Sequence, residues 1–248
     1  MIGIFITARL GSTRLSEKHL IEVNGKPLIR WLVERFSAAF KENIEKNELK
    51  IFITTSTKAE NKKFELIFDK KEAIVFYGSD QNIPLRHLEC AIKNNINYII
   101  SIDGDDILCS TEASKLVIDK LLNGAKMVQT KGLPLGMNTT GYSKDFLEKS
   151  LVGIESRNLE TGWGKIFDKN DIDIIQLGKD ESVEKIRMTL DYQPDADFFT
   201  KVISNIDVLN VSDDLLIKAI VSNNWNQIND HLDAIYWSNF NNQKQEEN

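Results

Sequence analysis

Short apolar runs alternate with segments of helical periodicity along most of this 248-residue chain. The apolar runs are brief, rich in β-branched side chains and bounded by turn residues, which is typical of buried strands. Strands that alternate with helices favour an α/β fold: a Rossmann-like, mixed but mostly parallel sheet with helices on both faces. Strands are predicted at residues 2–6, 50–55, 73–76, 97–102, 125–129, 171–177 and 186–191, with 97–102 as the central one.

Helices are predicted between these strands from the spacing of apolar residues and from capping signals. Pro27 and Pro194 stand at expected helix starts, because the fixed φ of proline suits a first helical turn. The helix at 110–123 is expected to bury a face made of Leu116, Val117, Leu121 and Leu122. Further helices are expected at 59–68, 85–92, 144–151, 213–221 and 231–237.

Length and charge narrow the classes of function. Residues 1–240 are assigned to a single domain, and 241–248 to a polar, disordered tail. A formal net charge of −6 argues against a nucleic-acid partner. No apolar stretch is long enough to span a bilayer, and the N-terminus lacks the features of a signal peptide. Two widely spaced cysteines, Cys90 and Cys109, fit reduced thiols, so a cytoplasmic protein is expected.

The loop after the first apolar run has the composition of a phosphate-binding loop. Three cationic residues fall within ten positions, and no carboxylate interrupts them before Glu17. Guanidinium groups bind phosphate oxygens in pairs, and a glycine lets the backbone approach a ligand closely. Solvated basic residues in an ordinary polar loop are the alternative interpretation. The candidate ligand contacts of this loop are Ala8, Arg9, Gly11, Ser12, Thr13, Arg14 and Lys18.

Three carboxylates follow the predicted central strand, in the sequence Asp103-Gly104-Asp105-Asp106. Carboxylates at the end of a buried strand are costly if they stay unpaired. Mg²⁺ would offset that cost, because it prefers oxygen ligands and often shares them with substrate phosphates. The alternative is a polar turn near a helix N-terminus.

Two further strand ends carry polar residues. Thr54 ends the strand at 50–55, where a parallel sheet commonly binds ligands, although capping of the next helix by Ser56 or Thr57 explains the same residues. Asp191 ends the segment 186–191, and the Asp195 that follows fits the first turn of a helix.

Residues 8–18 read ARLGSTRLSEK and resemble the signature ARxxSTRLPGK. That signature belongs to the sugar-acid cytidylyltransferases (CMP-Kdo synthetase-like) and to the related SpsF-like nucleotidyltransferases of polysaccharide biosynthesis. Ser16 and Glu17 replace the Pro-Gly of the signature. The resemblance continues at Asp103–Asp106 and at 187–195, where Asp103 and Ile107 differ from the usual family residues.

The resemblance implies a nucleotide-diphospho-sugar transferase (GT-A-like) fold, a function and a set of site residues. The expected reaction transfers CMP from CTP to a sugar, in the best-known members a 2-keto sugar acid, and releases pyrophosphate for surface polysaccharide synthesis. Mg²⁺ would be held by Asp105 and Asp191, and a homodimer is the default assembly. The implied catalytic residues are Arg9, Arg14, Lys18, Asp105 and Asp191, and the implied nucleotide contacts are Ala8, Arg9, Gly11, Ser12, Thr13, Arg14, Lys18, Thr54 and Asp103.

Two residues are open to either a structural or a functional interpretation. Arg86 follows a Gly-Ser pair as in the resembled proteins and could bind a phosphate or a sugar carboxylate, although a solvated helix residue is preferred. Trp163 lies between Gly162 and Gly164, which fits a packed aromatic in a turn or a mobile lid.

Two other functions remain open. A GT-A-like glycosyltransferase would use Asp103-Gly104-Asp105 as a D-x-D motif, but would have little need of the cationic loop. A catalytically silent nucleotide-binding relative would explain the altered residues Ser16, Glu17, Asp103 and Ile107.

Overall fold

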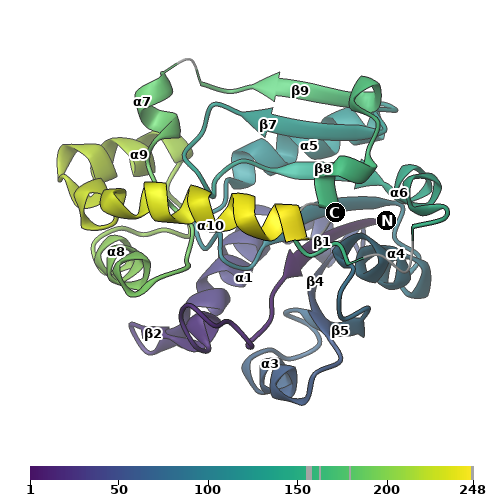
Figure 1. The fold of residues 1–248 in the computed structure, drawn as a ribbon, viewed down its shortest axis with the longest axis horizontal. Helices are drawn as coiled ribbons and strands as arrows, with labels where there is room; N and C mark the ends of the chain where they lie inside the picture. The colour runs from purple at the N-terminus through teal and green to yellow at the C-terminus, as the bar shows by residue number, and fades with distance from the viewer. Residues whose placement is uncertain (155–157, 162, 179, 247–248) are drawn as a thin grey trace.

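One mixed β-sheet organises the fold. A computed structural model describes residues 1–154, 158–161, 163–178 and 180–246. Within this part of the chain, a seven-stranded sheet has the order β5-β4-β1-β6-β8-β7-β9 (Figure 1). Its strands are β1 (Ile2–Thr7), β4 (Leu49–Ser56), β5 (Ile74–Gly78), β6 (Tyr98–Asp103), β7 (Met127–Lys131), β8 (Thr140–Ser143) and β9 (Ile172–Gln176), and β2 (Glu22–Val23) pairs with β3 (Lys26–Pro27) in a separate hairpin.

Most strand pairs in the sheet are parallel. β1 pairs in parallel with β4 on one side and β6 on the other, and β8 is antiparallel to its neighbours β6 and β7. The predicted α/β class with a mixed, mostly parallel sheet is confirmed, and β6 is central as predicted. The sequence did not predict β8, because the preceding residues are rich in Gly and Pro and indicated a loop.

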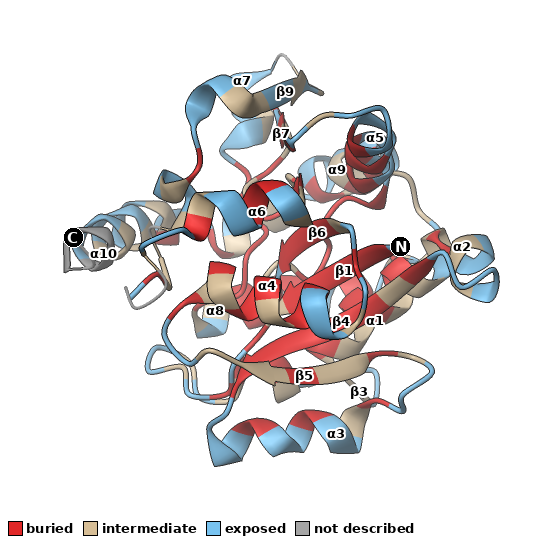
Figure 2. Cartoon of the chain, turned by 90° about the vertical axis from the view of Figure 1, so that its right-hand side faces the viewer, coloured by how far each residue is buried: buried red, intermediate tan, exposed pale blue. Residues whose placement is uncertain are grey.

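Helices cover both faces of the sheet (Figure 1). The pleat sends alternate side chains to opposite faces, so Ile4 and Ile6 pack in one apolar cluster and Phe5 in another. Figure 2 shows the buried strands between helices whose outer sides are exposed. The first cluster includes α1 (Leu28–Ala39), α3 (Phe64–Ile67) and α5 (Thr111–Leu122), and the second includes α4 (Ile83–Lys93) and α6 (Lys144–Leu151).

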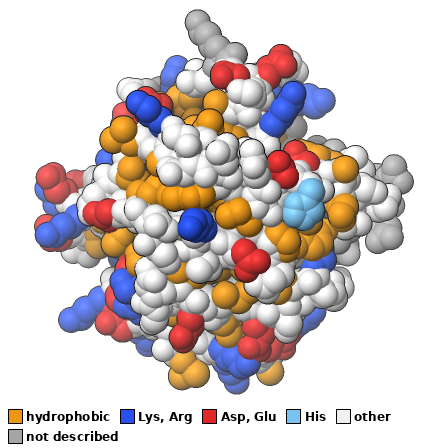
Figure 3. Space-filling view, turned by 90° about the vertical axis from the view of Figure 1, so that its left-hand side faces the viewer, with side chains coloured by type: hydrophobic (Ala, Val, Ile, Leu, Met, Phe, Trp, Pro, Cys, Tyr) orange, Lys and Arg blue, Asp and Glu red, His pale blue; other side chains and the backbone are white. Residues whose placement is uncertain are grey.

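The C-terminal helices form a third apolar cluster with the segment 186–190. Phe198 and Phe199 pack there with Leu216 and Ile220, and this packing buries the chain just before Asp191. The side of the molecule where these helices lie shows apolar atoms mixed with charges of both signs (Figure 3). The helices in this cluster are α8 (Gln193–Ile203) and α9 (Asp213–Ser222), and α10 (Asp233–Glu246) follows them at the end of the described chain.

None of the described helices is long and apolar enough to cross a membrane.

The remaining elements of the described chain are short. The short elements are α2 (Lys41–Glu45), α7 (Glu181–Glu184) and 3-10 helices at Lys18–Leu20, Ala59–Lys63, Trp163–Ile166, Lys169–Asp171, Trp225–Ile228 and Asp230–Leu232.

Some local predictions differ from the structure. The predicted helix at 59–68 is a 3-10 helix followed by the single turn of α3. In α5, Val117 and Leu121 are buried as expected, but Leu116 and Leu122 are exposed because they lie on the solvent side. Residues 241–246, assigned to a disordered tail, continue α10, while the last two residues of that tail lie outside the described part.

The segment 186–191 is not a strand of the sheet. Its only ladder contact among the described residues is an isolated bridge between Arg187 and Leu135. The segment is buried by the C-terminal helices instead, which explains its apolar sequence without a place in the sheet.

Candidate active site

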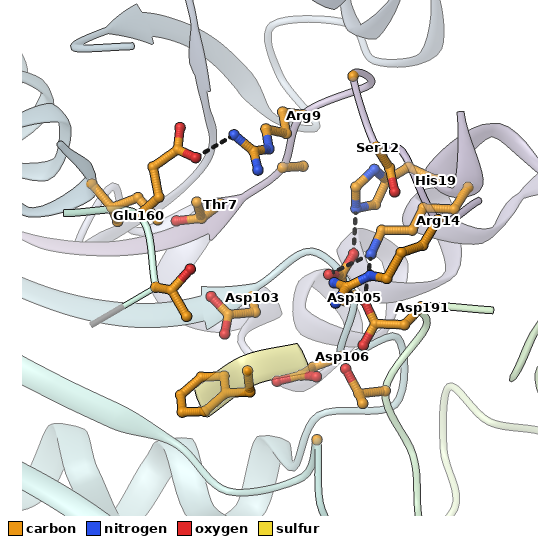
Figure 4. Close-up of a pocket in the computed structure, with 18 of the residues that line it drawn as sticks. Thr7, Arg9, Ser12, Arg14, His19, Asp103, Asp105, Asp106, Glu160 and Asp191 are labelled. Carbon is orange, nitrogen blue, oxygen red and sulfur yellow. Dashed lines mark hydrogen bonds and ion pairs between the residues drawn. The ribbon is translucent and has the colours of Figure 1, made fainter. Parts of the chain in front are cut away.

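The candidate site lies at the carboxyl edge of the sheet, where β1 and β6 end. These strands pair in parallel with Thr7 opposite Asp103, so the loops that follow them leave the sheet side by side. A cavity of about 330 Å³ opens there (Figure 4). The sequence-predicted site residues that line it are Ala8, Arg9, Gly11, Ser12, Thr13, Arg14, Lys18, Asp103, Asp105 and Asp191.

The turn after β6 packs directly against the loop after β1. Gly104 N donates a hydrogen bond to Thr7 O at 2.8 Å. A Cβ on Gly104 would lie 2.8 Å from Ala8 Cβ and 2.9 Å from Thr7 O, so this close approach requires glycine. The glycine therefore allows Asp105 to lie beside the cationic loop.

Asp191 reaches the cavity because backbone contacts hold its segment. Met188 N donates to Leu135 O at 2.8 Å, and Leu190 N donates to Asp105 O at 2.9 Å. Gly136 has a φ of +93°, and a Cβ there would lie 2.2 Å from Met188 O. These contacts bring two aspartates that are distant in sequence to one wall of the cavity.

Lys18 connects the two aspartates. Its Nζ lies 2.7 Å from Asp105 Oδ2 and 3.1 Å from Asp191 Oδ1, and 5% of its side chain is exposed. Arg14 Nη2 lies 2.6 Å from the same Asp191 oxygen, and His19 Nε2 lies 2.9 Å from Asp105 Oδ1 (Figure 4). The residues predicted to bind phosphate and those predicted to bind metal are therefore in direct contact.

These contacts shift the ionisation of the buried groups. Burial lowers the pKa of Lys18, but the charges of Asp105 and Asp191 outweigh it and the net pKa is raised. Desolvation opposes charge on Asp105, but the Lys18 ammonium and the contact with His19 hold the pKa of that carboxyl well below its usual range. Both Lys18 and Asp105 therefore stay charged at neutral pH.

Asp103 and Asp106 lie in the same wall, and neither forms an ion pair with another described residue. Desolvation and the charge of Asp105 raise the pKa of Asp103 to about 6. Desolvation and the charge of Asp103 raise the pKa of Asp106 well above its usual range. Both side chains therefore take up a proton more readily than a solvent-exposed aspartate does.

A buried network behind Asp191 was missed by the sequence analysis. The Arg187 side chain is 0% exposed, and its Nη2 lies 3.2 Å from Asp191 Oδ2. Its Nε and Nη2 donate to the two oxygens of Asp195 at 2.8 and 3.0 Å, and Asn229 Nδ2 donates to Asp195 Oδ1 at 2.8 Å. Asp195 lies in the first turn of α8 as predicted, and its side chain also accepts a hydrogen bond from Tyr192 N at 3.0 Å. An isolated arginine in an apolar segment gives no periodic signal of this role.

Two other arginines line the cavity on the side of α4. Arg9 Nη1 lies 2.6 Å from Glu160 Oε2, and half of the Arg9 side chain is exposed. The preferred interpretation of Arg86 as a solvated residue is wrong: it is 2% exposed, and its guanidinium donates to the carbonyls of Ser79 and Asp80. Arg86 therefore presents a buried, backbone-held charge to the cavity.

Aromatic residues complete the cavity wall. Trp163 packs against the rings of His87, Tyr142 and Phe167 at centroid distances of 6.1 to 6.5 Å, which supports the packed interpretation. Gly162, part of the lid alternative, lies outside the described residues. The lining residues that the sequence analysis did not single out are Thr7, His19, Ile83, Leu135, Gly136, Glu160, Thr161, Thr189, Tyr236 and Phe240.

Thr54 is the one predicted site residue that does not line the cavity. Its side chain is fully buried, and its Oγ1 lies 3.2 Å from Thr7 Oγ1 and 3.3 Å from His87 Nε2.

The Glu17 side chain does not line the cavity either. It pairs with Lys63, and the residue has a left-handed φ of 48°. The carboxylate that replaces the signature glycine is thus kept out of the cavity wall.

The described residues contain no group of three His, Cys, Asp or Glu side chains positioned to hold a metal ion. Asp105 and Asp191 nevertheless fit part of a cation site, because one oxygen of each converges on the single Lys18 Nζ. Mg²⁺ is usually held by one or two protein carboxylates, and phosphates and water supply its remaining ligands.

Comparison with known proteins assigns the family. A model of the family described as "Cytidylyltransferase" matches residues 3–151, which contain the cationic loop and Asp105. This chain belongs to the cytidylyltransferase family. The chain is also 26% identical over 216 residues to an uncharacterised protein of Methanocaldococcus jannaschii, a match that covers 85% of this chain and 86% of that protein.

Solved structures share the fold of this chain. A cytidylyltransferase from Leptospira borgpetersenii has a TM-score of 0.76 at 23% identity, with 91% of this chain and 95% of that one covered. CMP:2-keto-3-deoxy-manno-octonic acid synthetase, solved with CTP, has a TM-score of 0.57 at 12% identity, covering 82% and 98%. A 4-diphosphocytidyl-2C-methyl-D-erythritol synthase from Anaerococcus prevotii has a TM-score of 0.55 at 18% identity, with the same coverage.

Proposed function

We propose that this cytidylyltransferase transfers CMP from CTP to a hydroxyl group of a sugar and releases pyrophosphate. The observation that carries the proposal is the convergence of Arg14 and Lys18 with Asp105 and Asp191 in one cavity. Family membership and the resemblance of residues 8–18 to the cytidylyltransferase signature support it. A cationic loop alone implies only an anionic ligand, whereas a carboxylate pair beside it fits a metal-bound triphosphate.

The loop after β1 would bind the triphosphate. Arg9, Arg14 and Lys18 supply the opposite charge, and Ser12 and Thr13 add hydroxyl groups next to backbone N–H groups. These side chains fix the α-phosphate next to the acceptor, and such positioning supplies a large part of the rate enhancement in transfer reactions.

Asp105 and Asp191 would hold Mg²⁺ through the oxygens that now converge on Lys18. When bound, the metal ion would polarise the α-phosphate and offset charge on the leaving group. A hydroxyl oxygen of the sugar forms a bond to the α-phosphorus, and the bond from this phosphorus to the bridging oxygen breaks. Pyrophosphate leaves, and the hydroxyl proton passes to water.

The proposed acceptor is a 2-keto sugar acid, through its anomeric hydroxyl. The resemblance of residues 8–18 supports this class, and the structural neighbour that makes a CMP-linked 2-keto sugar acid shares the fold. On the same resemblance we propose a role in surface polysaccharide synthesis and a cytoplasmic homodimer.

A pyrophosphate-release assay tests the proposal. The purified protein is incubated with Mg²⁺, each of the four nucleoside triphosphates, and a panel of 2-keto sugar acids, neutral sugars and polyol phosphates. We expect release with CTP and a sugar acid, and about 10³-fold less from the Asp191→Asn variant. Release of a nucleoside diphosphate from a nucleotide-sugar would instead indicate a glycosyltransferase. CTP binding without turnover would indicate a silent relative, and failure to bind any nucleotide would refute the proposal.

A further inference from the structure

Lys18 lies where a cation shared by Asp105 and Asp191 would lie. Its Nζ is within 3.1 Å of one oxygen of each carboxylate, and its side chain is almost fully buried. Arg14 contacts the same Asp191 oxygen as Lys18 does. The oxygens best placed for a metal ion are therefore already paired with protein cations.

We propose that Lys18 is an internal counter-ion of this site, and that a divalent metal ion and the triphosphate of CTP displace it together. The inference rests on the proposed function. In the free protein the ammonium holds the two carboxylates in place. In the loaded protein the metal ion replaces it between the carboxylates, and Lys18 turns to the phosphate oxygens.

The charges around the two aspartates show why neither ligand binds tightly alone. Lys18 and Arg14 pair with Asp105 and Asp191, and Arg187 contacts both Asp191 and Asp195, so three cations balance three carboxylates. A divalent cation alone would add two positive charges to carboxylates that already have protein counter-ions. A triphosphate alone would approach two carboxylates whose counter-ions it must withdraw. When both arrive together, each compensates the charges that the other releases.

The side chains differ in their freedom to take part in this exchange. Lys18 has a flexible four-carbon stem, and Arg14 is 28% exposed at the cavity wall, so both can turn toward a ligand. Arg187 cannot leave, because its guanidinium is fully buried and bonded to both oxygens of Asp195. Arg187 would therefore keep Asp191 oriented through its other oxygen while Lys18 and Arg14 are exchanged.

Binding of Mn²⁺, followed by electron paramagnetic resonance without acceptor sugar, tests the exchange in the full-length protein. For the wild type we expect weak Mn²⁺ binding alone and at least about 10-fold tighter binding with CTP, after correction for metal bound to CTP in solution. CTP affinity must rise with Mn²⁺ by the same factor, because coupling between two ligands is reciprocal. A coupling factor of about 1 would overturn the proposal without recourse to any variant.

The Lys18→Met variant provides the sharper measurement, since it keeps the apolar stem and removes the charge. We expect it to bind Mn²⁺ alone about 10-fold more tightly than the wild type does, with a smaller coupling factor than that of the wild type. Lys18→Arg retains the charge and should keep the weak metal binding of the wild type. Lys63→Met is the matched control, because Lys63 contacts the same loop through Glu17 but neither aspartate. Unchanged or weaker Mn²⁺ binding by folded Lys18→Met would contradict the exchange.

The two proposals fail in different ways. If the wild type neither binds CTP nor releases pyrophosphate, the proposed function fails, whatever Lys18→Met does with Mn²⁺. If the wild type turns over CTP but Lys18→Met gains no metal affinity, the function stands and the exchange is wrong.

Discussion

Asp191 and Asp195 lie four residues apart and both contact Arg187, but their other partners differ in kind. Asp195 is fully buried, and its oxygens accept from Arg187, Asn229 and the backbone N–H groups of Asp191 and Tyr192. Asp191 faces the cavity, and its Oδ1 is paired with the long cationic side chains of Arg14 and Lys18.

The difference separates a structural ion pair from an exchangeable one. The donors on Asp195 belong to the buried interior, so removing one leaves a charge without compensation. The cations on Asp191 line a cavity, so they can turn to an anion that binds there. The same type of contact therefore stabilises the fold in one place and keeps a binding site ready in the other.

The largest expected effect comes from replacing each aspartate by asparagine. Asp191→Asn should lower pyrophosphate release about 10³-fold, because it removes charge at the metal and phosphate site, while it leaves the protein folded. Asp195→Asn should instead lower the free energy of unfolding by about 3 kcal/mol. Urea denaturation and the pyrophosphate assay measure the two effects. Equal destabilisation by both variants would abolish the distinction between the two carboxylates.

A second comparison uses the arginines. Arg187→Met should destabilise the fold by about 3–5 kcal/mol, because Asp195 loses its buried counter-ion. Arg14→Met should cost less than about 1 kcal/mol, since its side chain is partly exposed, but it should weaken CTP binding. Denaturation midpoints of the two variants, with calorimetric titration of CTP, check this. If Arg14→Met unfolded as readily as Arg187→Met, Arg14 would be structural too.

The buried cluster of Thr7, His87 and Tyr142 carries no charge, and its effect on the free energy of unfolding should depend on pH. Behind Thr7, His87 lies 2.8 Å from Thr7 Oγ1 and 2.6 Å from the Tyr142 hydroxyl, and burial together with the charge of Arg86 lowers its pKa to about 3. Below pH 6.5 the unfolded chain takes up a proton that folded His87 refuses, so stability falls as the pH falls. Between pH 7 and 5 His87 should contribute a loss of about 2 kcal/mol, measured as the difference between the wild type and His87→Gln. Parallel slopes for the two proteins would show that His87 is protonated in the fold.

The smallest expected effect concerns Asn229. Asn229→Ala removes one donor to Asp195 and should cost about 1–2 kcal/mol of unfolding free energy. Ser12→Ala, on the cavity side, should leave stability unchanged and affect only nucleotide affinity. Thermal denaturation distinguishes the pair, and an Asn229→Ala protein as stable as the wild type would mean that Asp195 does not need the Asn229 donor.

The sequence allowed prediction of those parts of the site that are local in the chain. The cations of the loop lie within ten residues, and Asp105 follows the central strand, so composition and periodicity indicate both. The meeting of Asp105 with Asp191 depends on backbone contacts between distant segments, and only the family resemblance pointed to it. The metal role of these aspartates stays a prediction.

Other features of the site have no recognisable pattern in the amino-acid sequence. Arg187 is an isolated arginine in an apolar segment, and Asn229 is one of several polar residues in its segment, so the burial of both follows only from the packing of α8 and the chain around it. Thr54 lies in β4, which continues to Ser56, and strand periodicity alone did not reveal that the Thr54 side chain contacts Thr7 and His87. Apolar content suggested a strand at 186–191, although the C-terminal helices bury that segment instead.

A crystal structure of the protein with CTP and Mg²⁺ tests the proposed displacement of Lys18 most directly. We predict a metal ion between Asp105 and Asp191, the triphosphate on the loop after β1, and Lys18 Nζ within hydrogen-bond distance of a phosphate oxygen. Arg187 should remain on Asp195. A triphosphate bound elsewhere would contradict the proposed CTP site. Lys18 still paired with both aspartates beside the bound nucleotide would contradict its displacement.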